Sequence, residues 1–156
     1  MLAFIRNANT ARSVAEVFHY LWELLGPDLF RSLFPLCLTD NGSEFTQPSA
    51  IELDPQGKRR TRVFYCDPYA SYQKGAIENN HSLLRRVIPK GISFNGLTQD
   101  DISLLMNHIN SYPRKKLNDR SPLQSFSFFH PLIPEKLGVR EIPTNDINLT
   151  PSLLRR

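Results

Sequence analysis

Residues 63–89, VFYCDPYASYQKGAIENNHSLLRRVIP, decide how the rest of this sequence is interpreted. The stretch begins with an apolar run typical of a short strand and continues through a polar, aromatic loop opened by Asp67-Pro68. A helical pattern follows, with Glu78 one turn inside its start. An earlier apolar run, LCLT, ends at Asp40. We therefore expect Asp40 and Glu78 to meet at one edge of a sheet, where metal-dependent phosphoryl chemistry would take place.

Length and charge set the class of protein. A chain of 156 residues is the size of one domain with a single core. The net charge of +4 is uneven: residues 1–52 carry three Arg against six acids, whereas residues 53–156 carry sixteen Lys or Arg against nine acids. A basic second part is compatible with binding a phosphate backbone, and equally with an ordinary solvated surface.

The positions of the cysteines and the lengths of the apolar stretches indicate the cellular compartment of the protein. Cys37 and Cys66 both lie in apolar runs, which favours buried thiols in a reducing cytoplasm over a disulfide. No apolar stretch is long enough to cross a membrane, and the start of the chain lacks a signal-peptide pattern. We expect a soluble, cytoplasmic protein without a membrane partner.

The first part of the chain alternates strand and helix patterns. Residues 1–5, MLAFI, resemble a strand, and apolar spacing over residues 11–25 predicts a helix capped by Asn9 or Thr10 and stopped by Gly26-Pro27. Trp22 is expected to pack inside and His19 to lie at the surface. Residues 34–39 predict a buried strand, covered on both faces. Residues 46–62 fit a hairpin or mobile loop, and their basic cluster is either solvated or a phosphate grip.

The second part contains two predicted helices and an irregular tail. After the helix that carries Glu78, Thr98 and Asp101 resemble a capping arrangement for a helix with an apolar face. From about Phe129 onward, repeated prolines argue against any long element. The pattern therefore predicts an α/β domain, with helices packed on a mixed sheet, over residues 1–126, and an irregular, Pro-rich extension over residues 127–156.

Asp40 and Glu78 suit a metal site because Mg²⁺ and Mn²⁺ prefer oxygen ligands held on rigid elements. On the helix, Glu78 shares one side with Ser82 and Arg85, while Ile77, His81, Leu84 and Ile88 share another that can pack on the sheet. Arg85 is placed to meet a phosphate. Taken singly, Asp-Asn-Gly is an ordinary turn and a Glu in a first helical turn ordinarily complements the helix dipole.

Three phrases of the sequence together resemble a known family. LTDNGSEF, FYCDPYASYQKGAIENNHSLLRRVIPKG and INSYPRKKLNDRSPLQSF occur in the order found in the catalytic core of the IS30-family transposases, which are DDE-superfamily enzymes. The resemblance spans roughly residues 1–126. It implies an RNase H-like fold, DNA cleavage and joining, and a pair of Mg²⁺ or Mn²⁺ ions in the complete enzyme.

The resemblance also implies roles for individual residues. Asp40 corresponds to the second catalytic Asp and Glu78 to the catalytic Glu, and both would be metal ligands. Positions beside the active site or on the same helix, which would contact DNA, match Gln73, Lys74, Asn79, Arg85, Arg86 and Lys90.

The chain departs from the family pattern at its start. The family's first catalytic Asp precedes the run that residues 1–5 resemble, and the only acids before Asp40 are Glu16, Glu23 and Asp28, on or just after a helix. The family's DNA-recognising N-terminal region has no counterpart either. We therefore interpret the chain as the C-terminal part of a transposase, lacking the first strands of the sheet, from a truncated or split gene or one whose start was assigned too late.

This interpretation predicts that the chain alone does not cut DNA. A second hypothesis is a catalytically dead remnant that binds DNA or pairs with full-length transposase or with itself, because a sheet without its first strands exposes an edge and apolar surface. A nuclease of the same fold that acts without joining is a third, weaker alternative, which the transposase phrases argue against.

Overall fold

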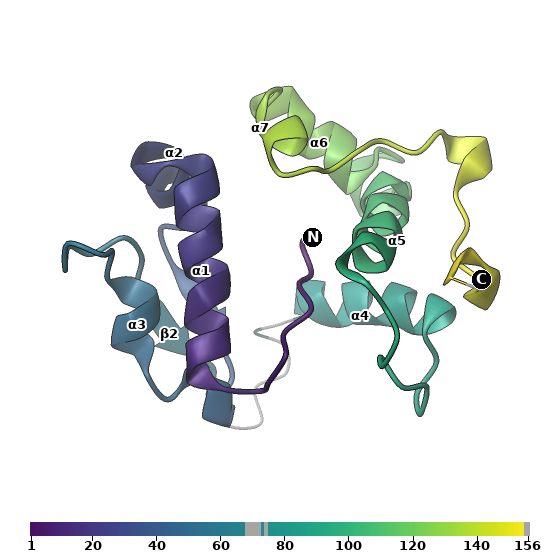
Figure 1. The fold of residues 1–156 in the computed structure, drawn as a ribbon. Helices are drawn as coiled ribbons and strands as arrows, with labels where there is room; N and C mark the ends of the chain where they lie inside the picture. The colour runs from purple at the N-terminus through teal and green to yellow at the C-terminus, as the bar shows by residue number, and fades with distance from the viewer. Residues whose placement is uncertain (68–72, 74, 155–156) are drawn as a thin grey trace. The chain divides into compact units, whose positions relative to one another are not determined.

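The computed structural model describes residues 1–67, 73 and 75–154, which form two compact units. Residues 6–73 form one unit, here called the sheet unit, and residues 1–5 with 74–156 form the other, here called the helical unit. Figure 1 colours the sheet unit from purple to blue and most of the helical unit from teal to yellow. Each unit is described by itself.

The sheet unit combines helices with a short parallel sheet. Its elements, in chain order, are α1 (Ala11–Leu25), α2 (Pro27–Leu33), β1 (Cys37–Thr39), the 3₁₀ turn η1 (Ser43–Phe45), α3 (Pro48–Glu52) and β2 (Val63–Tyr65). The predicted helix over residues 11–25 is confirmed, and a capping box between Thr10 and Ser13 starts it. Gly26 ends it with a φ of 80°, but Pro27 then begins α2, a helix that we did not expect.

Aromatic side chains and one arginine fill the interior of the sheet unit. Phe30 is fully buried and packs edge-on against Trp22, with ring centroids 5.4 Å apart, as the prediction of a packed Trp22 requires. His19 is exposed, also as predicted. One alternative for the basic cluster, that its side chains are solvated, does not hold for Arg60, which is only 4% exposed. Its guanidinium donates to Ile51 O at 2.9 Å and Ala50 O at 3.2 Å, the carbonyls of α3.

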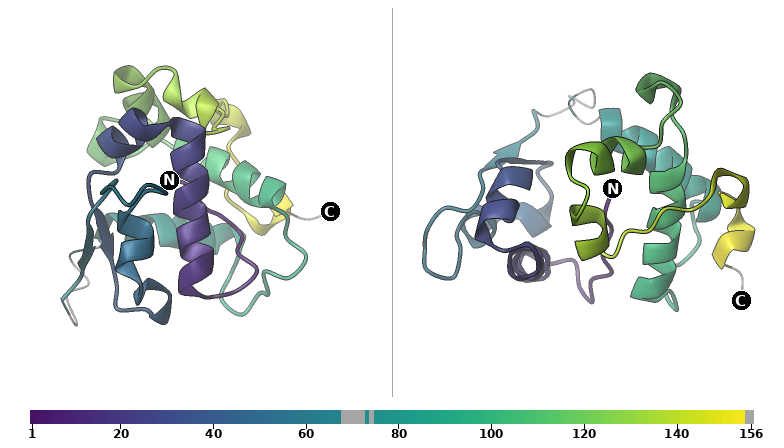
Figure 2. Two further views of the ribbon diagram at one scale, coloured as in Figure 1. Left: turned by 60° about the vertical axis from the view of Figure 1, so that its left-hand side comes forward. Right: turned by 90° about the horizontal axis from the view of Figure 1, so that it is seen from above.

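Residues 46–62, expected to form a hairpin or a mobile loop, form α3 and then a tight turn closed by an antiparallel bridge, so the hairpin alternative is correct in part. Figure 2 shows α3 beside the turn that follows it. The buried Asp54 carboxylate accepts from the backbone N–H groups of Gln56 at 3.0 Å and Lys58 at 2.8 Å, and Gly57 takes a φ of 76°. An antiparallel bridge joins Leu53 to Arg59. A side chain that replaces backbone partners in this way holds a tight turn.

The sheet is a parallel pair with the register Cys37↔Val63, Leu38↔Phe64 and Thr39↔Tyr65. Two of the three predicted strands are therefore present, but the prediction that residues 34–39 are covered on both faces was wrong for β1. Leu38 is 39% exposed and its cross-strand partner Phe64 is 50% exposed, whereas Thr39 on the other face is buried. Both cysteines are free, Cys66 buried and Cys37 half-buried, and burial raises the pKa of the Cys37 thiol.

The helical unit is built around two helices. Its elements are α4 (Gly75–Val87), α5 (Gln99–Ser111), η3 (Lys115–Leu117), α6 (Pro122–Phe129), α7 (Ile133–Lys136), η4 (Thr144–Asp146) and η5 (Pro151–Leu154). The predicted capping box of Thr98 and Asp101 begins α5. The expected apolar face of α5 is buried, with Leu105 and Ile109 fully enclosed, and it packs against Leu83, Val87 and Ile88 of α4.

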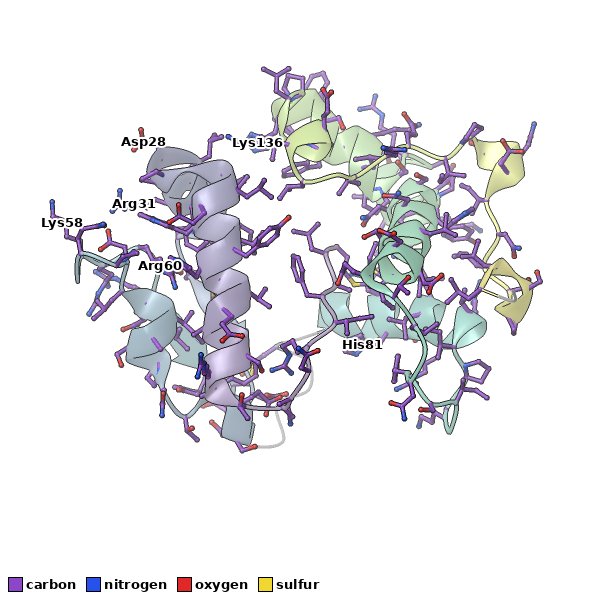
Figure 3. All side chains as sticks on the ribbon, viewed as in Figure 1. Asp28, Arg31, Lys58, Arg60, His81 and Lys136 are labelled. Atoms are coloured by element: carbon purple, nitrogen blue, oxygen red, sulfur yellow. The ribbon has the colours of Figure 1, made fainter. Side chains whose placement is uncertain are left out.

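The packed side of α4 differs from the expected one. We expected His81 to share the packing face, but His81 is exposed (Figure 3). The buried residues Leu83 and Val87 lie one turn apart instead, and Ile88 follows at the helix end. Ser82 and Arg85, expected on the side of Glu78, are exposed.

Residues 1–5 are not a strand, contrary to the prediction. They run extended along α5, whose side-chain amides satisfy their backbone. Gln99 accepts from Ile5 N at 2.9 Å and donates to Ala3 O at 3.1 Å, and Asn110 donates to Met1 O at 2.8 Å. An apolar run can therefore be accommodated against a helix without strand pairing.

Short helices and two 3₁₀ turns occupy the last part of the chain. Ser121 and Gln124 form a capping box for α6, which starts at Pro122, so Pro122 begins a helix. Farther on, Leu149, Leu153 and Leu154 pack against the α4–α5 core. The division at residue 126 stays a prediction. Among the described residues, no helix is long and apolar enough to span a membrane.

Candidate functional site

Asp40 lies directly beyond the carboxyl end of β1. Because β1 and β2 are parallel, Asp40 and Asp67 come at the same edge of the sheet, the edge at which open α/β sheets bind their ligands. Cys66 N donates to Thr39 O at 2.8 Å, so the ladder continues up to these acids. Both aspartates are exposed. The edge therefore presents two carboxylates to solvent.

A third carboxylate lies near Asp40. Gly42 N donates to Asp40 Oδ1 at 3.4 Å, and η1 follows at once. A Cβ atom added at Gly42 would lie 2.6 Å from Glu44 Oε2 and 3.1 Å from Asp40 Oδ1. The absence of a side chain at Gly42 therefore leaves room for both carboxylates. Sequence reasoning did not single out Glu44 or Asp67, although both lie inside the quoted motifs.

Gln73 contacts Asp67 through both ends of its amide. Asp67 N donates to Gln73 Oε1 at 3.0 Å, and Gln73 Nε2 donates to Asp67 Oδ2 at 2.9 Å. These two hydrogen bonds join positions six residues apart and hold the Gln73 amide at the sheet edge. The role of Gln73 in DNA binding stays a prediction. Lys74 lies outside the described residues.

Glu78 is the fourth residue of α4, as predicted, and belongs to the helical unit, whereas Asp40 belongs to the sheet unit. The remaining predicted residues on or after α4, Asn79, Arg85, Arg86 and Lys90, are all exposed. The Arg85 guanidinium lies 6.0 Å from the centroid of the Phe94 ring and donates to Ile88 O at 3.5 Å. Arg85 is therefore held over the end of its own helix.

A second basic element follows α5. Arg114 is half-buried, donates to Asn80 Oδ1 of α4 at 3.0 Å, and burial lowers its pKa. An antiparallel bridge joins Arg114 to Arg120 and closes a turn in which Asn118 and Asp119 both take positive φ. Lys115 and Lys116 lie in this turn and are exposed to solvent. The PRKKL motif therefore supplies one structural arginine and two exposed cations.

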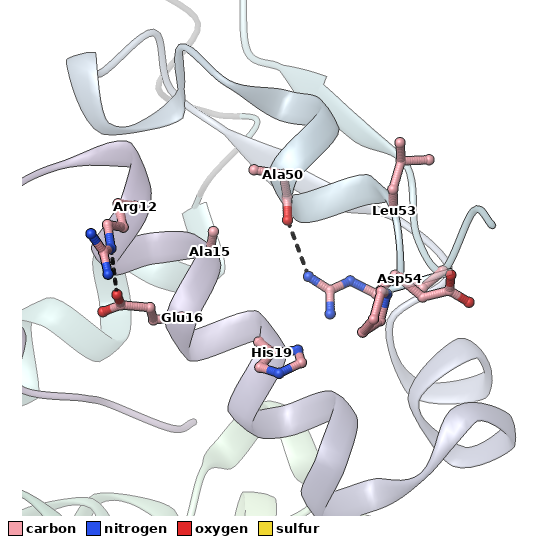
Figure 4. A pocket seen from close by; sticks show the side chains of 9 residues that line it. Arg12, Ala15, Glu16, His19, Ala50, Leu53 and Asp54 are labelled. Carbon is pink, nitrogen blue, oxygen red and sulfur yellow. Dashed lines mark hydrogen bonds and ion pairs between the residues drawn. The ribbon is translucent and has the colours of Figure 1, made fainter. Parts of the chain in front are cut away.

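No metal cluster is preformed in the described part of the chain. No group of three or more His, Cys, Asp or Glu side chains is arranged there to hold a metal ion. An open pocket of about 390 Å³ lies between α1 and the end of α3, lined by residues that include Glu16, His19 and Asp54 (Figure 4). On the α1 side of the pocket, Arg12 Nε and Glu16 Oε1 form an ion pair at 3.0 Å. The predicted site residues are not among those that line it.

Comparison with known proteins shows what the chain is similar to. It is similar to several insertion-sequence transposases, including one of IS30, as its motifs predicted. It is 34% identical over 96 residues to the transposase for insertion sequence element IS4351 of Bacteroides fragilis, a match that covers 62% of this chain and 28% of that protein.

Two further relatives match shorter stretches. The transposase for IS1086 of Cupriavidus metallidurans is 41% identical over 63 residues, 40% of this chain and 19% of the relative. Transposase InsI for IS30A of Escherichia coli is 34% identical over 61 residues, 39% of this chain and 16% of the relative. The matches thus cover less than a third of these relatives. No protein-family model matches the chain, and no solved structure matches it.

Proposed function

We propose that this chain is part of a DDE transposase that cleaves and joins DNA with the help of Mg²⁺ or Mn²⁺. The observation that carries the proposal is the similarity to three transposases at 34–41% identity. The position of Asp40 supports it, because the carboxyl edge of a parallel sheet is where α/β enzymes place their sites. An RNase H-like fold for the complete protein is part of the same proposal.

Asp40 and Glu78 are proposed as the metal ligands, and carboxylates suit a hard divalent cation. When bound, the metal would polarise a phosphodiester and activate the attacking hydroxyl. The protein's own cations then position the DNA backbone. The exposed side chains on or after α4, namely Asn79, Arg85, Arg86 and Lys90, are available for this task, and Gln73 and Lys74 are proposed beside them.

We further propose that the chain does not cut DNA by itself. The resemblance implies a first catalytic Asp that precedes Asp40 in the chain, so Glu44 and Asp67, which follow Asp40, do not correspond to it. Of the acids before Asp40, Glu16 is paired with Arg12 on α1, Glu23 lies exposed near the end of α1, and Asp28 lies in the first turn of α2. All three therefore belong to the helices α1 and α2, away from the ends of the strands in sequence.

Incubation of the purified chain with DNA carrying transposon ends and Mn²⁺ tests both parts. We expect no nicking above a metal-free control. Nicking that Asp40→Ala abolishes would show that the site is complete, and would overturn the proposed inactivity while supporting the metal role of Asp40. Asn41→Ala, at the exposed neighbouring position, is the matched control.

A second candidate function is a DNA-binding remnant that pairs with full-length transposase or with a second copy of itself. The basic charge of the helical unit favours it. DNA binding that is unchanged by Glu78→Gln and independent of Mg²⁺ would favour this candidate, because a working metal site would couple DNA affinity to the metal.

A further inference from the structure

The guanidinium of Arg114 is only partly used by the helical unit. Nη2 donates to Asn80 Oδ1 at 3.0 Å and to Ile109 O at 3.4 Å, which joins the end of α5 to α4. Nη1 forms no hydrogen bond with any described residue. Nε is buried, and among the described residues it is the one buried side-chain nitrogen or oxygen without a partner. Two of the three guanidinium nitrogens therefore have no acceptor in the described part of the chain.

Arg60 shows how the same chain satisfies an arginine that has a structural role. Each of its three guanidinium nitrogens donates to a backbone carbonyl oxygen, at 2.9, 3.4 and 3.2 Å, of Ile51, Phe18 and Ala50. Asp54 also opposes the lowering of the Arg60 pKa that burial causes. A buried donor without an acceptor costs free energy that a satisfied donor does not. Packing alone therefore explains Arg60 but not Arg114.

No carboxylate offsets the charge of Arg114 in the part of the chain that the structure describes. None of the ion pairs found there includes Arg114. Its two acceptors, an amide oxygen and a carbonyl oxygen, are neutral, and burial lowers its pKa. A charge that is partly withdrawn from water is ordinarily paired with an opposite charge. The surroundings of Arg114 are therefore suited to an anion.

The neighbouring cations indicate which kind of anion. Residues 114–120, RKKLNDR, carry four Lys or Arg against one acid, and Lys115, Lys116 and Arg120 are exposed. The backbone bridge from Arg114 N to Arg120 O, at 3.0 Å, closes the turn that holds them. Clustered cations attract a chain of negative charges more strongly than a single carboxylate, and a guanidinium suits phosphate oxygens. A phosphodiester chain therefore fits this turn better than one acidic side chain does.

We propose that Arg114 binds a phosphodiester of DNA through Nη1, while Nη2 stays on Asn80. Nη1 has no partner among the described residues and, unlike Nε, is not buried, so it reaches solvent. Asn80 follows Glu78 by two positions in α4, so the bound phosphate lies beside the part of α4 that carries a proposed metal ligand. Arg114 is not among the positions for which the family resemblance implies DNA contact. Because DNA is the substrate only under the proposed function, this site rests on that function.

Duplex DNA binding by the full chain, measured by fluorescence anisotropy, tests the site. Arg114→Gln should weaken binding about tenfold at low salt, because a hydrogen-bonded ion contact is lost. The slope of log affinity against log salt should become shallower by about 0.9. Arg140→Gln removes the same charge at an exposed position of the same unit and should have a smaller effect on both quantities. Equal effects of the two variants would overturn the proposal.

Asn80→Asp covers the case in which Arg114→Gln does not fold. The new carboxylate would give Arg114 an internal ion pair, so the melting temperature should not fall while DNA binding weakens. Asn95→Asp adds the same charge at an exposed position between α4 and α5, and it should weaken DNA binding less. If both variants bind DNA alike, the role of Arg114 is structural only and the proposal is overturned.

A titration with dimethyl phosphate, the smallest phosphodiester, separates this site from the proposed function. It should shift the side-chain Nε resonance of Arg114 in ¹⁵N NMR and leave that of Arg60 in place, and glutamate at the same concentration should shift Arg114 less. A larger shift with glutamate would overturn the phosphate assignment in favour of an acidic protein segment. A shift with dimethyl phosphate but no binding of DNA would keep the phosphate site and overturn DNA as its source. DNA binding that leaves the Arg114 resonance in place would overturn the site and leave the proposed function standing.

Discussion

At the scale of single residues, His108 shows how one side chain holds a distant segment. His108 lies in α5, is 6% exposed, and accepts a hydrogen bond from Asn148 N at 3.1 Å through Nδ1. Burial lowers its pKa below the ordinary value, and the nearby Asp146 opposes this shift to a smaller extent. Only a neutral imidazole can accept this bond, so the segment that carries Leu149 depends on the uncharged form.

Stability should therefore fall as the pH drops through the ordinary histidine range. The folded state holds His108 with a lowered pKa, so the unfolded chain binds more protons just below pH 6.5, and the free energy of unfolding decreases there. Urea denaturation at pH 7.5 and 5.5 measures the decrease. His108→Asn places an amide oxygen that accepts but does not titrate, and it should reduce the pH dependence. An equal decrease in that variant would show that other groups cause it.

Single residues also mark the limit of sequence reasoning. Arg60 stands in the run GKRRTR, where nothing in the sequence separates it from its neighbours, yet it is buried and its guanidinium lies over the rings of Trp22 and Phe30. The hydrogen-bond acceptors of Arg60 are backbone carbonyls of the helices α1 and α3. These carbonyls lie at irregular distances from Arg60 along the sequence, so no sequence pattern indicates them. Asp40, by contrast, was predictable as a strand-end acid, because a short apolar run followed by Asp-Asn-Gly has few other structures.

At the scale of elements, the helices that are determined by residues close in sequence were predicted correctly. The helix over residues 11–25 and α5 follow from apolar spacing and N-terminal caps, and both have the expected capping residues. The prediction for residues 1–5 was wrong because an apolar run carries no information about its partner, which is α5 rather than a strand. The helix α6 was missed because Phe- and Pro-rich composition concealed the Ser-Pro start.

That start gives a testable prediction. Ser121 is 1% exposed, and its hydroxyl accepts from Gln124 N at 3.0 Å, while the Gln124 side chain accepts from Ser121 N at 3.0 Å. Ser121→Ala should lower the free energy of unfolding by about 1–2 kcal/mol, because the partly buried N–H of Gln124 would be left without its acceptor. Ser127→Ala, inside the same helix, should change stability by less than about 0.5 kcal/mol. Similar values for both variants in urea denaturation would contradict the capping role.

At the scale of the whole molecule, the basic charge is concentrated in one structural unit. The helical unit carries twelve Lys or Arg against seven acids, and the sheet unit carries seven against eight. Twelve of the sixteen Lys or Arg of the basic second part, residues 53–156, therefore lie in the helical unit. The candidate acids Asp40 and Asp67 belong to the nearly neutral unit, and the exposed cations Arg86, Lys115 and Lys116 belong to the basic one.

This division predicts which unit binds the DNA backbone, if the proposed function holds. Lys115→Glu with Lys116→Glu removes two exposed cations from the helical unit and should weaken binding to duplex DNA at least fivefold in fluorescence anisotropy at low salt. The slope of log affinity against log salt should also become shallower, by up to about 0.9 for each phosphate that the protein no longer neutralises. Lys58→Glu with Arg62→Glu makes the same charge change at exposed positions of the sheet unit, and it should have a smaller effect on both quantities. The opposite ranking of the two double variants would assign DNA binding to the sheet unit, and equal effects would mean that net charge alone governs binding.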